Sequence, residues 1–261
     1  MQLSYRVHPG HGPFLFLVHG FLTGSAQWQD NIDALATQVT PVTIDLWGHG
    51  DSPTPLDAAA YHPANYLAEF ERIRITLGAP RIYLCGYSLG AGLTLRYALT
   101  HPERIIAQAF TNSSSGLADA DEQAGWKAGA SAAAERIRAG GIAAVEALPV
   151  HPKRARHLPG HVYESLIIES ARLSPEGVAR TLEVTNPNAS VRQEIARNTI
   201  RTLLLCGARE SRFRAKRDFA ARVMPALTVV DLPVGHGVNM ENPALFNAAL
   251  LEFLSSYRHA S

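Results

Sequence analysis

The stretch Ile82-Tyr-Leu-Cys-Gly86-Tyr-Ser-Leu-Gly90 decides how this sequence is interpreted. Its apolar beginning is typical of a buried strand, and the residues from Leu89 to Thr100 have the pattern of a helix. Ser88 therefore stands in a sharp strand-to-helix turn, with Gly86 and Gly90 two residues to either side. Side chains at those positions would collide with the strand and the helix, so the pattern predicts a strained turn that exposes a nucleophilic serine. The alternative, a serine that merely caps the helix, is disfavoured by the strand before it.

A serine needs a neighbouring base at neutral pH, and His236 is the best placed of the eleven histidines. It lies in Pro233-Val-Gly-His-Gly-Val-Asn239, after the last apolar run and before the final helical pattern. Along the chain, nucleophile, acid and then histidine is the order that this kind of turn uses. The alternative is a capping histidine on a surface loop.

The acid is expected in the loop Gly207-Ala-Arg-Glu210, after an apolar run that ends at Cys206. A carboxylate there can accept the imidazole N–H, fix the tautomer of the ring and stabilise the imidazolium. We therefore predict Glu210 as the acid. The alternative is a solvated charge beside Arg209 and Arg212.

Two backbone N–H groups are expected to hold the negative oxygen of the tetrahedral intermediate. One is the amide of Leu89, the residue after the nucleophile. The other should come from the loop His19-Gly-Phe-Leu-Thr-Gly24, which follows an apolar run, and we predict the amide of Phe21. His19 is expected to support this loop.

Short apolar runs alternate with longer helical patterns, which predicts an α/β fold with a mostly parallel sheet flanked by helices. Helices are expected over 64–77, 89–100 and 243–257, the last with a proline in its first turn. The predicted strands are Leu3 to Val7, Phe14 to Val18, Pro41 to Asp45, Ile82 to Cys85, Ile105 to Thr111, Thr202 to Cys206 and Leu227 to Asp231.

The connection from Thr111 to Thr202 is about ninety residues long, too long for an ordinary loop. Several prolines and the pair Gly140-Gly141 divide it into shorter helical segments. We predict one core formed by residues 1–115 and 198–261. Residues 116–197 would be a helical cap (lid) over the carboxyl edge of the sheet.

Composition limits the partners of this protein. Its 24 Lys and Arg residues are nearly balanced by 23 Asp and Glu, so no global field attracts nucleic acid or a membrane surface. Cys85 and Cys206 are expected to be free core thiols. The N-terminal residues lack the pattern of a signal peptide, and no apolar stretch approaches the ~20 residues that span a bilayer. We expect a cytoplasmic protein that acts on a small molecule as a monomer or small homo-oligomer.

Two further clusters are not expected to bind a phosphate or a metal: the first is expected to be a structural turn and the second a solvated basic stretch. The glycine-rich stretch from Asp45 to Pro53 lacks the lysine and the following helix of a phosphate loop, so we expect a tight turn locked by its own side chains. His151, His157 and His161 are separated by prolines, with no cysteine or carboxylate to complete a metal site. No metal or other cofactor is predicted.

The order of these motifs resembles the α/β-hydrolase superfamily over nearly the whole chain. More narrowly, Gly20-Phe-Leu-Thr-Gly-Ser25 and Leu205-Cys-Gly-Ala-Arg-Glu-Ser-Arg-Phe-Arg214 look like the branch that contains 2-succinyl-6-hydroxy-2,4-cyclohexadiene-1-carboxylate synthase, the lyase of menaquinone biosynthesis. This resemblance implies a triad of Ser88, Glu210 and His236 beneath a helical cap.

The resemblance also bears on the substrate, because that branch binds a dianion through several arginines. Arg172 matches one of them, and Arg212 stands where a cation follows the acid. Gly92 and residues 125–127 provide no arginine where the branch has others, so we expect a less anionic substrate. The residues expected to contact it are Tyr87, Trp126, Arg172, Arg212 and Phe213.

These features predict acyl transfer to water, with an ester or thioester as substrate. A cofactor-free lyase or carbon–carbon hydrolase, in which His236 and Ser88 abstract a proton, is the alternative. A binding module that kept the fold but lost catalysis is a third reading, disfavoured by the complete triad.

Overall fold

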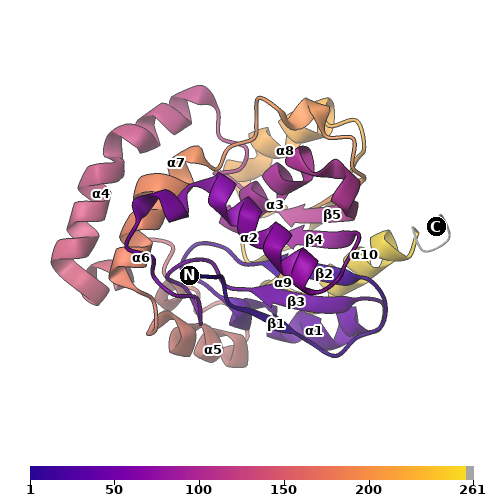
Figure 1. The fold of residues 1–261 in the computed structure, drawn as a ribbon, viewed down its shortest axis with the longest axis horizontal. Helices are drawn as coiled ribbons and strands as arrows, with labels where there is room; N and C mark the ends of the chain where they lie inside the picture. Colours follow the sequence, from indigo (N-terminus) through magenta and orange to yellow (C-terminus); the bar gives the residue numbers. More distant parts are fainter. Residues whose placement is uncertain (257–261) are drawn as a thin grey trace.

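The computed structural model describes residues 1–256, which form an α/β fold on one seven-stranded sheet (Figure 1). The strand order is β1-β3-β2-β4-β5-β6-β7, with β1 antiparallel to β3 and the other pairs parallel, so the predicted mostly parallel sheet is confirmed. The strands are β1 (Tyr5–Val7), β2 (Phe14–Val18), β3 (Thr40–Ile44), β4 (Ile82–Gly86), β5 (Ile105–Thr111), β6 (Thr202–Gly207) and β7 (Leu227–Leu232).

The predicted strand bounds hold for β2 and β5 and differ by one or two residues elsewhere. The largest difference is at β1, which was expected to begin at Leu3 and begins at Tyr5. The amide of Leu3 donates to Glu69 Oε2 at 2.8 Å, while its side chain is buried. A hydrogen bond to a helix side chain therefore takes the place of the first hydrogen bonds that β1 was expected to make with its neighbouring strand.

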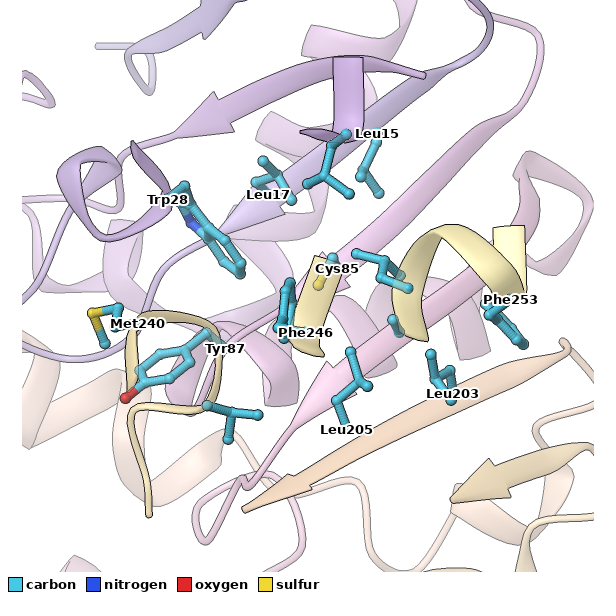
Figure 2. Close-up of a cluster of buried hydrophobic side chains, with 14 of the residues drawn as sticks. Leu15, Leu17, Trp28, Cys85, Tyr87, Leu203, Leu205, Met240, Phe246 and Phe253 are labelled. Atoms are coloured by element: carbon cyan, nitrogen blue, oxygen red, sulfur yellow. The ribbon is translucent and has the colours of Figure 1, made fainter. Parts of the chain in front are cut away.

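Helices cover both faces of the sheet. On one face, Trp28 and Phe246 share an apolar cluster with Leu15 and Leu205 of the sheet (Figure 2). Phe70 and Leu93 pack on the other. The helices of the core are α1 (Gln29–Ala36), α2 (Pro63–Thr76), α3 (Leu89–Thr100), α8 (Arg214–Val223), α9 (Val238–Glu241) and α10 (Pro243–Ser255). The predicted helix over 89–100 is confirmed, and the predicted end of the last helix at Tyr257 lies outside the described residues.

Residues 116–197, here called the insert, contain four α-helices between β5 and β6. Most of them gather on the left of Figure 1, away from the C-terminus. Leu22, from the loop after β2, packs with Ile137 and Val178 of the insert. The insert thus rests directly on the core, and its role as a lid stays a prediction. Its helices are α4 (Ala120–Glu146, kinked at Gly141), α5 (Gly160–Ser170), α6 (Pro175–Arg180) and α7 (Asn186–Asn188).

Short helical turns lie between several of these elements. Cys85 and Cys206 are free and buried, as expected. Among residues 1–256, no helix is both long and apolar enough to cross a membrane. The turns are η1 (Ser25–Trp28), η2 (Ala58–Tyr61), η3 (Pro102–Arg104), η4 (Pro152–Arg154), the π-helical η5 (Thr181–Thr185), η6 (Ile195–Arg197) and η7 (Ser211–Phe213).

Candidate active site

Ser88 occupies the tight turn between β4 and α3 with a backbone φ of 52° and ψ of −113°. Such a conformation is strained for a residue with a side chain. The flanking glycines make it accessible: a Cβ on Gly86 would lie 2.5 Å from Ala91 Cα, and one on Gly90 would lie 2.5 Å from the carbonyl oxygen of Val18. The predicted steric reason for the two glycines is therefore present.

The structure brings Ser88, His236 and Glu210 together. His236 Nε2 lies 3.1 Å from Ser88 Oγ, although the two residues are 148 positions apart in the chain. His236 Nδ1 lies 2.8 Å from Glu210 Oε2. Because an ionised carboxylate only accepts hydrogen bonds, Nδ1 carries the proton and Nε2 is left to accept one from the serine. This arrangement can activate a hydroxyl.

Glu210 is kept ionised by its neighbours. Burial by itself would raise the pKa of this carboxyl, but hydrogen bonds from His236 and Asn112, together with the charge of Arg212, lower the pKa overall. A charged acid in this position favours a positive imidazole beside it. Glu210 can therefore stabilise the imidazolium that forms when the serine loses its proton.

Asn112, just after β5, is a site residue that sequence reasoning missed. Its Nδ2 donates to Glu210 Oε2 at 2.6 Å and to the carbonyl of Gly207 at 3.2 Å, while its Oδ1 accepts from the amide of Gly207 at 3.0 Å. The side chain is fully buried. Asn112 thus fixes both the end of β6 and the acid that follows it. A polar residue at the end of a predicted buried strand was the available signal.

The loop after β2 places the amide of Phe21 near the nucleophile turn, because Gly20 packs directly against Tyr87 and Ser88. Within residues 1–256, neither the amide of Phe21 nor that of Leu89 donates a hydrogen bond, so both remain available to a substrate oxygen. Leu22 next to them has a φ of 64°, which turns the loop sharply.

Two buried histidines hold this loop. His19 Nδ1 donates to the carbonyl of Gly20 at 2.7 Å and Nε2 accepts from the amide of Leu46 at 2.8 Å. His49 Nε2 accepts from the amide of Leu22 at 3.3 Å. Burial lowers the pKa of both imidazoles, that of His49 to about 3, so both stay neutral. The contacts agree with the expected structural role of His19.

A chain of buried amides joins the histidine loop to the loop after β2. Asn239, three residues after His236, donates to the carbonyl of Gln27 at 2.8 Å and to Asn31 Oδ1 at 3.0 Å. Gln27 Oε1 in turn accepts from the amide of Gly20 at 3.2 Å. Buried amides are costly unless paired, so these bonds fix the distance between the two loops.

The predicted substrate residues are distributed less favourably. Tyr87 is nearly buried, and its ring meets the His236 ring edge-on at 5.3 Å (Figure 2 shows Tyr87 in the core cluster). Arg212 is exposed, and it lies close enough to Glu210 for its positive charge to lower the pKa of that carboxyl. Trp126 is half-buried on α4.

One of these predictions needs correction. Phe213 is fully buried in the apolar cluster around Phe110 and Leu204, so it belongs to the core and exposes no surface to a substrate. Arg172 is exposed and pairs with Asp51 and the carbonyl of Gly50, in the loop after β3, and its contact with a substrate stays a prediction. The pattern of the sequence did not reveal these tertiary partners.

The Asp45 turn is locked by its own side chains, as expected. Asp45 Oδ1 accepts from the amide and the hydroxyl of Ser25 at 2.9 and 2.6 Å, and Oδ2 accepts from the amide of Asp51 at 2.9 Å. Ser52 Oγ donates to the carbonyl of Asp45 at 2.6 Å. These groups are already paired, which leaves the turn a structural role.

Comparison with known proteins agrees with this geometry. A family model described as "alpha/beta hydrolase fold" matches residues 13–148. The 2-succinyl-6-hydroxy-2,4-cyclohexadiene-1-carboxylate synthase of Klebsiella pneumoniae (strain 342) is 27% identical over 98% of this chain and 100% of that protein. The protein of the same name from Escherichia coli O1:K1 / APEC is 26% identical over 93% of this chain and 94% of that protein.

Solved structures give the same result. MenH from S. aureus has a TM-score of 0.85 at 21% identity, covering 98% of this chain and 99% of that chain. A hydrolase from Pseudomonas aeruginosa PA01 has a TM-score of 0.80 at 25% identity, covering 97% and 94%. The predicted fold class and the predicted resemblance are both confirmed.

Proposed function

Because this chain belongs to the α/β-hydrolase family, we propose that it is a serine hydrolase that cleaves a carboxylic ester or thioester through an acyl-enzyme on Ser88. The observation that carries the proposal is the continuous hydrogen-bond chain from Ser88 Oγ through His236 to Glu210. Such a chain lets a neutral imidazole remove the serine proton while a carboxylate holds the ring.

The proposed reaction has two halves. Ser88 Oγ attacks the carbonyl carbon while its proton passes to His236 Nε2; the same proton then goes to the departing alcohol or thiol, which leaves an acyl group on Ser88. Water next attacks the acyl carbon and gives a proton to His236, which returns it to Ser88 Oγ as the acid is released. The free amides of Phe21 and Leu89 would hold the negative oxygen in each half, at about 3 kcal/mol per donor.

Ser88→Ala should reduce hydrolysis of p-nitrophenyl acyl esters on the order of 10⁵-fold, because the nucleophile is lost. Initial rates and thermal unfolding of the variant measure activity and folding separately. Ser165→Ala, on α5, is the matched control and should retain activity, since the hydroxyl of Ser165 lies outside the triad. Turnover by Ser88→Ala at the wild-type rate would contradict the assignment.

A lyase or carbon–carbon hydrolase is the second candidate, because relatives named for synthase activity match over nearly the whole chain. One feature points away from their substrate: Gly92 stands where that branch has an arginine, and a Cβ there would lie 3.1 Å from Gly116 Cα and the carbonyl oxygen of Ala189. Mass spectrometry of enzyme quenched with ester would reveal an acyl group on Ser88 for the hydrolase. Formation of the product named in those relatives, without such an adduct, would favour the lyase.

Three further expectations accompany this proposal. The insert would act as a lid over the site, the enzyme would work in the cytoplasm, and it would be a monomer or a small homo-oligomer. The close packing of Leu22 with the insert supports the first of these.

A further inference from the structure

Glu169 joins the insert to the loop that carries Phe21. It lies near the end of α5, and its Oε1 accepts from the amide of Ala26 at 3.1 Å. A Cβ on Gly24 would lie 2.5 Å from the same oxygen, so the chain approaches the carboxylate as closely as a glycine allows. Glu169 of the insert therefore contacts residues 19–28, here called the oxyanion loop, and restrains the position of that loop.

The charges around Glu169 are few and known. Asp45, from the loop after β3, binds Ser25 of the same oxyanion loop. The positive charge of Arg172 lowers the pKa of Glu169, although Arg172 is itself paired with Asp51. Glu169 Oε2 is buried without a hydrogen-bond partner among residues 1–256. The carboxyl thus faces one acid, one already engaged cation and two backbone amides.

This environment makes Glu169 titrate near neutrality. Burial raises the pKa of the carboxyl from 4.5 to about 7, and Asp45 adds to the rise, while the amides of Ala26 and Gly24 and the charge of Arg172 oppose it. The ionised form is the stronger acceptor for a backbone N–H. The raised pKa shows, however, that loss of water costs the ionised carboxyl more than these amides return, so the contact with the oxyanion loop should weaken as the pH rises through 7.

We propose that Glu169 is a positioning residue, whose buried carboxyl couples α5 to the oxyanion loop and so aims the amide of Phe21 at the substrate oxygen. This inference rests on the proposed function. It assigns to the insert a part in transition-state stabilisation, through a contact that bypasses the triad entirely.

The contact with Glu169 is separable from the docking of α5. At the other end of that helix, His161 Nε2 lies 2.7 Å from Asp30 Oδ2 of α1, and the apolar Val162 and Leu166 pack into the core. A change at Glu169 should therefore leave α5 in place. His161→Ala is the matched control, because it breaks a tie of α5 without touching the oxyanion loop.

Glu169→Gln keeps an acceptor for Ala26 but can no longer ionise. We expect its kcat on p-nitrophenyl esters to match wild type near pH 5.5 and to exceed wild type at pH 8.5 by up to about tenfold, the scale of one hydrogen bond, because only wild type ionises there. KM should change little, because the contact aims a transition-state donor. His161→Ala should keep the wild-type pH profile.

Hydrogen exchange of residues 19–28 reads the same coupling without catalysis. After correction for intrinsic exchange, protection of the loop should decrease from pH 6 to pH 8.5 in wild type and stay constant in Glu169→Gln. Identical exchange and identical kcat profiles for the two proteins would overturn the proposal. A wild type that is inactive on every ester but retains the pH-dependent protection would refute the proposed function and leave the coupling standing.

Discussion

At the scale of single residues, Asn112 helps to keep Glu210, the proposed acid, ionised. Its amide nitrogen and the His236 ring both donate to the same oxygen of Glu210, at 2.6 and 2.8 Å. Together with the hydrogen bond from His236, the Asn112 donor keeps the pKa of Glu210 low despite burial. The arrangement of the three proposed catalytic residues therefore depends on a neutral side chain that takes no part in the proposed reaction.

Asn112→Ala should lower kcat on esters by about tenfold or more, because a hydrogen bond to a buried charge is worth ~1.5–3 kcal/mol. The pKa of Glu210 should rise, so the acid limb of the kcat–pH profile should move to higher pH. Asn65→Ala, on the exposed surface of α2, is the control. An unshifted pH profile in Asn112→Ala would show that Asn112 only supports β6.

Glu169 also predicts a pH dependence of stability. Its pKa is about 7 in the folded protein and ordinarily 4.5, so the folded state holds the proton more tightly than the unfolded state. The stability that Glu169 contributes is then fully present below pH 4.5, decreases between pH 4.5 and 7, and stays lost above pH 7. The whole effect is at most about 3 kcal/mol.

Glu169→Gln should therefore be more stable than wild type at pH 8, by on the order of 1–2 kcal/mol after loss of some hydrogen bonding, and no more stable near pH 4.5. Urea unfolding at the two pH values measures this. Equal differences at both pH values would mean that Glu169 does not titrate in this range.

At the scale of elements, α6 and the loop after β3 meet backbone to backbone. A Cβ added to Gly177 would lie 2.6 Å from Gly48 Cα, and Gly48 has a φ of 72° that a side chain would also resist. The amide of Ser174 donates to the carbonyl of Gly48 at 3.1 Å across the same contact. The insert therefore contacts the core at a point where Gly177 and Gly48 face each other with no side chain between them.

Gly177→Ala should destabilise the protein by about 1–3 kcal/mol, because neither backbone segment can yield without shifting its neighbours. Thermal unfolding measures the loss. Gly125→Ala, on α4 where a Cβ meets nothing within 4 Å, should be neutral or stabilising by up to ~1 kcal/mol. A Gly177→Ala protein as stable as wild type would mean that this contact can separate at little cost.

For the whole molecule, the fold was predictable because it follows from local pattern. The meeting of Ser88, Glu210 and His236 was predictable because each residue follows an apolar run that forms a parallel strand, and their catalytic roles stay a proposal. Apolar runs defined the strands, and the glycines around Ser88 defined the turn. The neighbours of Asn112, Phe213 and Arg172 were not predictable, because each depends on a segment distant in the chain. Pairing between such side chains leaves no period in the sequence.

The amides of Gln27, Asn31 and Asn239 have a wider consequence for how this enzyme could acquire new substrates. They link the loop of His236 to the loop of Phe21, so neither loop can be displaced to accommodate a bulkier molecule without breaking buried hydrogen bonds. Adaptation is thereby directed to residues 116–197, whose side chains other than Glu169 can vary while Ser88 and His236 keep their spacing. Exchanging that segment between homologues, with Glu169 retained, should transfer preference for acyl size and leave the chemical step unaltered.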